Sequence, residues 1–299
     1  MVIYLAQKLQ SKGLKVAIVS RGYRRKTSGT MMVSDGKKIL LSWEEAGDEP
    51  YFMANCLLEI PVVVDEIRYR GGLFAIEKFN PDIIILDDAF QHRAVNRDID
   101  IVLLNSHDPP DVYKLLPYGK LREPWFHLRR ADLIFWTKVN FKPPHPTLRN
   151  KAPCAKIPTF TSRMEPDHFL RNVSNHTLSL SKIKGKKVLA FCGIADPESF
   201  RWLLLDIGAK IEHFKTFEDH HMYQESEVRM LIDEGQKSGI DLFITTDKDI
   251  FKVTQWVPEE IRLYSLGIHF IPSREGEERL MNWLGKLDFI KGTVVTGGR

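Results

Sequence analysis

Short apolar runs alternate with helical patterns along the first half of the chain. The apolar runs have the length and β-branched content of strands, and they lie at residues 14–20, 61–65, 82–88, 98–105 and 131–137. Helices are predicted between them at 1–13, 47–58 and 67–79, and a hairpin turned at Asp35 and Gly36 is predicted within 31–43. Such alternation predicts an α/β fold built on a doubly wound parallel sheet.

A second alternation follows a proline-rich segment. Residues 139–158 carry five prolines and no periodicity, which favours a domain boundary. Strands are then predicted at 187–192, 209–214, 241–246 and 262–266, with helices after Pro197 and from residue 224. We therefore predict an N-terminal domain at 1–145, a linker at 146–160 and a smaller C-terminal α/β domain at 161–299. The final segment, 291–299, is expected to be a frayed tail.

Composition places the chain among globular proteins of about two domains. It has 299 residues, of which 43% are hydrophobic and 27% charged. The net charge of +4 would suit an anionic substrate or a membrane surface, but it is too small to indicate nucleic acid, which we do not expect as a partner.

Cysteine spacing and hydropathy restrict the setting. The cysteines, Cys56, Cys154 and Cys192, are far apart and form no ligand motif, which argues against a disulfide framework or a zinc site and fits a reducing cytoplasm. No apolar run reaches the roughly 20 residues of a spanning helix. The helix at 1–13 begins in mid-pattern without a cap, so we expect a further segment upstream.

Asp87 and Asp88 follow the apolar run 83–86 directly. A parallel sheet binds ligands at the carboxyl ends of its strands, and Mg²⁺ prefers carboxylate oxygens, as in the Walker B strand of phosphoryl-transfer enzymes. The sequence therefore predicts a magnesium site. The alternative is that the two acids cap the next helix or pair with Arg93.

Two further acidic motifs carry weaker signals on their own. Asp48 lies in the motif GDEP (47–50), which could be only the acidic first turn of a helix. Glu123 lies in LREP (121–124), where an arginine and a glutamate before a proline are more often a surface pair.

The second domain offers an acid and imidazole pair. Asp219 and His220 lie in FEDHHMY (217–223), just beyond a predicted strand, and such a pair can serve in proton transfer. A single histidine here would more often be structural. The polar stretch 245–249 follows another predicted strand, so strands of both domains are followed by polar residues. A cleft between the domains is therefore the predicted substrate site.

A basic cluster follows the first strand. Arg21, Arg24, Arg25 and Lys26 are equally compatible with a solvated loop and with a site that binds a substrate phosphate. No Walker A motif accompanies them, because none of the Gly-Lys pairs, at Gly36, Gly119, Gly185 and Gly285, is followed by Ser or Thr.

Several motifs in a fixed order resemble a known family. They are SRGYRR (20–25), GDEPYFMA (47–54), DDAFQHRAVNRDIDIVLL (87–104), LLPYGKLREP (115–124), FCGIADPESF (191–200) and FEDHH (217–221). From about Met1 to residue 250 the chain is similar to tetraacyldisaccharide 4'-kinase, the lipid A 4'-kinase of Gram-negative bacteria.

The resemblance implies a fold and an activity. The fold would be a P-loop-kinase-like doubly wound parallel sheet, with its first strand and P-loop absent from this chain, and a second, smaller α/β domain. The activity would be ATP-dependent phosphorylation of the 4'-hydroxyl of a tetraacylated disaccharide 1-phosphate, giving lipid IVA. ATP and Mg²⁺ would be cofactors, and the lipid A disaccharide precursor and the inner-membrane surface would be partners. The enzyme would be peripheral, on the cytoplasmic face of that membrane, and the 299-residue chain itself would be soluble.

The resemblance also implies roles for single residues. Asp48 and His220 would form a catalytic dyad at the attacking hydroxyl, and Asp87 and Asp88 would hold magnesium. Glu123 would take part in cofactor binding, and Arg21, Arg24 and Arg25 would contact the anionic lipid.

The family's P-loop and its hydrophobic N-terminal segment would precede the helix that begins at Met1. We therefore expect a sequence that starts late, with about 40 to 60 further residues upstream. The alternative is a catalytically inactive remnant that binds acyl-disaccharide or a partner protein.

Overall fold

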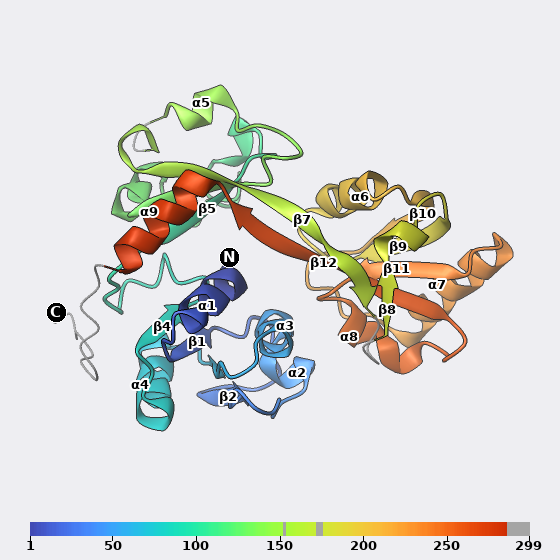
Figure 1. The fold of residues 1–299 in the computed structure, drawn as a ribbon, viewed down its shortest axis with the longest axis horizontal. Coiled ribbons are helices and arrows are strands. Elements are labelled where there is room, and N and C mark those ends of the chain that lie inside the picture. Colours follow the sequence, from blue (N-terminus) through green and yellow to red (C-terminus); the bar gives the residue numbers. More distant parts are fainter. Residues whose placement is uncertain (152–153, 172–175, 286–299) are drawn as a thin grey trace. The chain divides into compact units, whose positions relative to one another are not determined.

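The computed structural model describes residues 1–151, 154–171 and 176–285 (Figure 1). It divides into two compact units. The first unit is Met1–Met164 together with the chain from Phe270, and the second unit is Glu165–His269. The two boundaries fall inside the strands β7 (Thr159–Arg171) and β12 (Arg262–Pro272).

The first unit contains a four-stranded sheet with the order β2-β3-β1-β4. Its strands are β1 (Val16–Ser20), β2 (Met31–Ser34), β3 (Val62–Val64) and β4 (Ile83–Leu86). Strands β3 and β4 run parallel to β1, and β2 runs antiparallel to β3. The three parallel strands therefore end at the same edge.

Helices cover both faces of this sheet because side chains alternate along β1. Val16 and Ile18 pack with residues of α1 (Val2–Ser11) and α3 (Asp48–Cys56). Ala17 and Val19 point the other way and pack with Ala75 of α4 (Arg68–Phe79). A short helix, α2 (Trp43–Ala46), precedes α3 and begins with a capping box made by Ser42 and Glu45.

A second group of parallel strands completes the first unit. Strands β5 (Ile101–Asn105) and β6 (Leu133–Thr137) pair in parallel, and β6 pairs in parallel with the first part of β7. The helix α9 (Arg274–Leu284) approaches this sheet closely, since a Cβ on Gly276 would lie 2.8 Å from Phe135. The remaining elements are η1 (Pro110–Val112), η2 (Trp125–Arg130), α5 (Pro146–Arg149) and η3 (Cys154–Lys156).

The second unit is a smaller α/β sheet with the strand order β10-β9-β11-β12. Here β9 is Lys187–Cys192, β10 is Lys210–Thr216, β11 is Leu242–Thr246, and the helix α7 is Glu225–Lys237. The pairs of β9 with β10, β9 with β11 and β11 with β12 are all parallel. Leu189 and Phe191 of β9 pack with the apolar face of α7. Its other elements are β8 (Thr177–Ser179), α6 (Pro197–Asp206), α8 (Ile250–Val253), η4 (Leu180–Lys182) and η5 (Thr254–Trp256).

The alternating strands and helices predicted from the sequence are confirmed, and so is the α/β class. One local expectation differs. The hairpin around Asp35 is reduced to β2 and an isolated antiparallel bridge between Ser34 and Ile39. Of the four residues of β4 only Ile85 is fully buried, because β4 is the last strand in the order of its sheet.

The division into units also differs from the predicted domains. The predicted linker, 146–160, contains α5, η3 and the start of β7, all within the first unit. The chain from Phe270 returns to the first unit, whereas we predicted that 161–299 would form one domain. The predicted tail, 291–299, lies outside the described residues.

No helix in the described part of the chain is both long enough and apolar enough to cross a membrane.

Candidate active site

Polar residues meet where the parallel strands of the first unit end. Ser20 is the last residue of β1, Asp65 follows β3, and Asp87 follows β4. The strands are in register here, with Val19 beside Leu86 and Ser20 beside Val64. The Ser20 hydroxyl donates a hydrogen bond of 2.9 Å to the Asp87 carboxylate. The sheet therefore brings Asp87 to the edge where the sequence placed a ligand site.

The surroundings of Asp87 disfavour its negative charge. Burial raises the pKa of this carboxyl, and the charge of Glu49 raises it further. The hydrogen bond from Ser20 and the charge of Arg68 act in the opposite direction without cancelling the shift. A cation bound beside Asp87 would relieve this cost.

Glu49 also shows where the first turn of α3 lies. Its charge acts on Asp87, which indicates that the start of α3 lies near the end of β4. Asp48 is the first residue of α3, and its Oδ1 accepts a hydrogen bond of 2.9 Å from the Glu49 amide. The acidic helix start and the Asp87 edge thus belong to the same region of the first unit.

Arg68 is a component of the edge that the sequence did not reveal. It is the first residue of α4 and is only 3% exposed. Its guanidinium donates to the Asp65 carbonyl at 2.9 Å and to the Asp87 carbonyl at 3.5 Å. Burial lowers the pKa of this group, whereas the charges of Asp87 and Asp88 raise it. A buried cation therefore lies beside the acidic pair.

His92 lies within reach of the same charges. Burial, followed by the positive charges of Arg68, Arg97 and Arg21, lowers the pKa of this imidazole. His92 is therefore neutral at pH 7. Its position in DDAFQHR, five residues after Asp87, was the only sequence signal that could have drawn attention to it.

The motif LREP is connected to the acidic pair through Arg122, whereas Glu123 has other partners. Arg122 forms an ion pair of 2.8 Å with Asp88, and both side chains are 56% exposed. Glu123 accepts hydrogen bonds from Arg130 at 2.6 Å and from His127 at 2.8 Å. Burial opposes ionisation of Glu123, but Arg130 and His127 outweigh it and lower the pKa of the carboxyl.

Arg130 links Glu123 back to the segment after Asp88. Its guanidinium lies 4.5 Å from the centre of the Phe90 ring and donates to the Phe90 carbonyl at 3.2 Å. Glu123 therefore supports the turn that carries the acidic pair.

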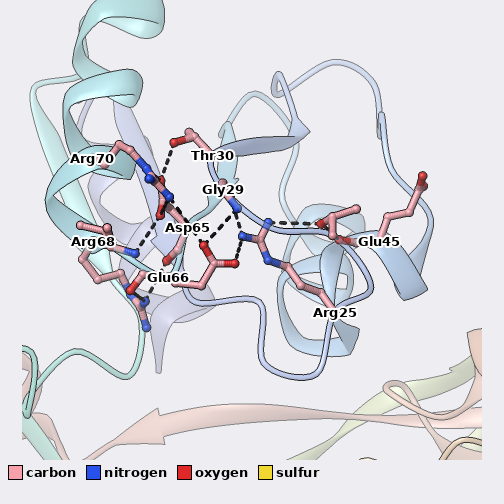
Figure 2. A network of polar contacts seen from close by, with 10 residues as sticks. Arg25, Gly29, Thr30, Glu45, Asp65, Glu66, Arg68 and Arg70 are labelled. Carbon is pink, nitrogen blue, oxygen red and sulfur yellow. Dashed lines mark hydrogen bonds and ion pairs between the residues drawn. The ribbon is translucent and has the colours of Figure 1, made fainter.

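The arginines of the basic cluster have different surroundings. The Arg25 side chain is 2% exposed and pairs with Glu66, as Figure 2 shows. Arg24 is exposed, with its guanidinium 5.5 Å from the centre of the Tyr23 ring. Arg21 is exposed as well, and its charge acts on Arg68 and His92. Arg21 therefore lies near the acidic edge, and Arg25 is part of the support of the loop.

His220 belongs to the second unit. Its backbone has φ of 60° and donates to the Gly193 carbonyl at 3.2 Å, which joins the motif FEDHH to the motif FCGIADP. Its Nε2 lies 3.7 Å from Asp219. The neighbouring His221 has a different role, because its Nε2 binds Glu227 at 3.0 Å and its ring stacks on Phe217.

A buried ion pair follows β11 in the second unit. Asp249 is fully buried and accepts hydrogen bonds from the Gly193 amide at 2.9 Å and from Thr246 at 2.7 Å. Lys252, also buried, lies 3.3 Å from the same carboxylate. At the polar end of β11 predicted from the sequence, the Asp249 carboxylate thus has its hydrogen-bond donors and its cation within this unit.

Asp48 and the acidic pair lie in the first unit, and His220 lies in the second. The catalytic dyad and the cleft between domains stay predictions.

The acidic edge suits a magnesium ion that retains water and phosphate ligands. Among the residues that the structure describes, no group of three or more His, Cys, Asp or Glu side chains is arranged to hold a metal. Mg²⁺ commonly needs only one or two protein carboxylates when substrate phosphates supply further oxygens. Asp87, Asp88 and the Ser20 hydroxyl fit this mode.

Similarity to known proteins covers most of the chain. Residues 1–285 match the family model described as LpxK, tetraacyldisaccharide-1-P 4'-kinase. The tetraacyldisaccharide 4'-kinase of Aquifex aeolicus is 40% identical over 252 residues, which cover 84% of this chain and 73% of the relative. The corresponding protein of Desulfotalea psychrophila is 37% identical over 278 residues, with 88% and 76% covered.

A solved structure agrees with the fold. The crystal structure of an "apo" form of LpxK from Aquifex aeolicus in complex with ATP matches with a TM-score of 0.74 and 37% sequence identity. The match covers 95% of this chain and 82% of the other. This likeness supports the P-loop-kinase-like α/β fold expected from the sequence.

Proposed function

Because this chain belongs to the tetraacyldisaccharide 4'-kinase family, we propose that it transfers phosphate from ATP to the 4'-hydroxyl of a tetraacyldisaccharide 1-phosphate in lipid A biosynthesis. The product would be lipid IVA. The observation that carries the proposal is that the surroundings of Asp87 disfavour its negative charge. Asp87 lies at the strand edge where nucleotide phosphates bind in this fold class.

Asp87, Asp88 and Ser20 would hold the magnesium of Mg·ATP. When bound there, Mg²⁺ would neutralise charge on the phosphate oxygens. Ser20 orients the Asp87 carboxylate through its hydrogen bond, and Arg122 restrains Asp88. Arg68 adds a fixed positive charge next to the pair.

Asp48 and His220 are proposed as the groups that take the proton from the attacking hydroxyl. Aspartate is a weak base at neutral pH, so coupling to an imidazole would make proton removal more effective. The position of Asp48 at the start of α3, next to Glu49, whose charge acts on Asp87, supports its part in the proposal. Asp219, 3.7 Å from His220, would help to orient the imidazole.

Arg21 and Arg24 are proposed as contacts for the anionic disaccharide. Both are exposed, and the charge of Arg21 acts on Arg68, which lies beside the acidic pair. Arg25 was predicted to share this role, but its buried pairing with Glu66 favours a supporting role. For Glu123, predicted to bind the cofactor, the bonds to Arg130 and His127 likewise favour support of the acidic turn.

A peripheral position on the cytoplasmic face of the inner membrane is part of the proposal. An apolar loop at 112–121 supports it: Leu116 is 63% and Tyr118 85% exposed. The loop is closed by bonds from Lys120 N to Val112 O (2.8 Å) and from Leu121 N to Lys114 O (3.0 Å), so these side chains are held outward. Lys114 and Lys120 flank them; Lys120 is paired with Asp108 at 2.7 Å, so Lys114 is the side chain that would favour anionic lipid headgroups.

The test of the membrane proposal is sedimentation with vesicles that contain anionic phospholipid. The double change Leu116→Ser and Tyr118→Ser should reduce the bound fraction severalfold, because it removes the exposed apolar area. Equal binding of this variant and the wild type would argue against this loop.

The activity is tested directly with the native protein, labelled ATP, Mg²⁺ and tetraacyldisaccharide 1-phosphate. The expected product carries a second phosphate, with phosphorus-proton NMR correlation to the proton at position 4'. Lipid binding with neither phosphate transfer nor ADP release would instead favour the inactive binding protein considered from the sequence.

A further inference from the structure

The loop that follows β1 packs closely on the segment that leads into α3. Within this loop, residues 21–30 and here called the basic loop, the Lys26 amide donates to the Glu44 carbonyl at 2.8 Å. The Thr27 hydroxyl donates to the Glu45 carbonyl at 2.6 Å. The basic loop is therefore bonded to the residues just before Asp48.

Two glycines make this approach possible. Gly22 has φ of 68°, and a Cβ there would lie 2.8 Å from the Ala46 carbonyl oxygen. Gly47 has φ of 90°, and a Cβ there would lie 3.2 Å from the Gly22 Cα. Since the two backbones touch, a shift of the basic loop must shift Gly47, the residue before Asp48.

The basic loop is held on its other side by Glu66. Glu66 accepts a hydrogen bond from the Arg25 guanidinium and one of 3.1 Å from the Gly29 amide (Figure 2). Arg25 donates in turn to the Gly29 carbonyl at 2.5 Å and to the Thr27 hydroxyl at 3.3 Å. One ion pair thus connects Glu66 to several points of the loop.

Asp65 supplies a second point of attachment. It is fully buried, accepts two hydrogen bonds from Arg70 at 2.7 and 2.8 Å, and accepts another from the Thr30 hydroxyl. The Ile67 amide donates to it at 2.7 Å. Burial opposes its charge, but Arg70 and Thr30 outweigh burial and lower the pKa of the carboxyl, so Asp65 is ionised at neutral pH.

We propose that Asp65 and Glu66 are positioning residues for phosphoryl transfer: they fix the basic loop, and the loop fixes Gly47 and the Asp48 carboxylate. This inference rests on the proposed kinase function and on the role of Asp48 in it. It assigns Asp65 and Glu66 no contact with substrate. Their effect reaches the reacting hydroxyl through Arg25, Thr30 and the backbone of the loop.

The kinetic test compares Glu66→Gln and Arg25→Met in the native protein. Each should lower kcat at least tenfold and change KM for Mg·ATP less than twofold, because the phosphate edge at β4 is left intact. The double variant should be no slower than the slower single variant, since both changes break one pair. Arg25→Lys should recover part of the rate lost in Arg25→Met.

Glu278→Gln is the matched control, because Glu278 forms an exposed ion pair of 2.9 Å with Arg274 in α9. It should have wild-type kinetics.

Hydrogen exchange tests the coupling without any assay of activity. In Glu66→Gln, amides of residues 44–49 should exchange at least threefold faster than in wild type, and in Glu278→Gln they should not change. Unchanged exchange in that segment, or a wild-type kcat in folded Glu66→Gln, would overturn this inference. A wild-type protein that transfers no phosphate would instead overturn the proposed function, whatever the exchange shows.

Discussion

Two strand edges of this protein end in carboxylates with opposite surroundings, Asp249 fully buried and Asp87 partly buried. Asp249, after β11, receives hydrogen bonds from Thr246 and the Gly193 amide and has the buried cation Lys252 3.3 Å away. Asp87, after β4, receives one hydrogen bond from Ser20, and its pKa is raised by burial and by Glu49.

The difference separates a structural acid from a candidate ligand. The charge of Asp249 is balanced within its own unit, so its removal leaves a buried cation without its partner. The charge of Asp87 is balanced less completely, so a bound cation would stabilise it. An acid at the end of a strand thus indicates a metal site only where the positive charge that the fold supplies, here Arg68, does not fully offset the cost of ionising the acid.

The largest expected effect is loss of activity in Asp87→Asn. The amide keeps the shape and can accept the Ser20 hydrogen bond, but it supplies no charge for Mg²⁺. We expect kcat/KM to fall about 10²–10³-fold or more. The melting temperature measured in EDTA should rise, because the disfavoured charge is gone. A fall in melting temperature would show that Asp87, like Asp249, is balanced in the folded protein.

Asp249→Asn should have the opposite effect on stability. It leaves the Lys252 ammonium buried without its charged partner, so the free energy of unfolding should fall by roughly 3–5 kcal/mol in urea denaturation. The double variant Asp249→Asn with Lys252→Met should recover much of this loss, because it removes both charges. A double variant less stable than the single one would contradict the assignment of an ion pair.

The pH dependence of stability should also distinguish acids with opposite shifts. For Asp87, whose pKa is raised in the folded protein, the cost in stability is absent below the unfolded value of about 3.9, grows as the pH rises toward the folded value, and is constant above it. The gain in melting temperature in Asp87→Asn should therefore be near zero at acidic pH and largest at pH 7–8.

Asp65 should show the reverse pattern. Its pKa is lowered, so its contribution is present above the unfolded value and is lost as the pH falls through the folded value. Asp65→Asn should therefore lose most stability at neutral pH and least in acid. Melting curves of both variants from pH 3 to 8 check the two signs together.

The smallest effect is expected for Arg122→Gln. Its pair with Asp88 is 2.8 Å long, but both side chains are exposed, so its loss should change the free energy of unfolding by less than about 1 kcal/mol. Any change in KM for Mg·ATP should shrink as salt is added, because exposed charges are screened. A loss of several kcal/mol would show that this pair is as essential as the buried one.

Much of the fold could be predicted because the parallel strands are short, apolar and β-branched. The long strand β7 was missed because Thr159–Arg171 includes charged residues and Pro166, which a local pattern does not identify as a strand. The return of the chain at Phe270 was missed because the predicted strand, 262–266, is only the first part of β12.

At the site, the local sequence pattern identified the acidic residues but not the arginines that lie beside them or support the neighbouring loop. Asp87 and Asp88 follow from the end of an apolar strand. Arg68 resembles an ordinary surface residue of a helix, and its burial beside Asp87 depends on contacts across the sheet. Arg25 could not be distinguished from Arg21 and Arg24, because its partner Glu66 is 41 residues away in the chain.

The most direct measurement is Mn²⁺ binding by electron paramagnetic resonance, with Mn²⁺ replacing Mg²⁺, in the presence of ATP. Wild type, Asp87→Asn and Asp249→Asn are compared at a temperature where all three are folded. The account predicts that Asp249→Asn binds the ion with wild-type affinity and that Asp87→Asn binds it at least tenfold more weakly. Wild-type affinity in Asp87→Asn would contradict the assignment of this edge as the metal site.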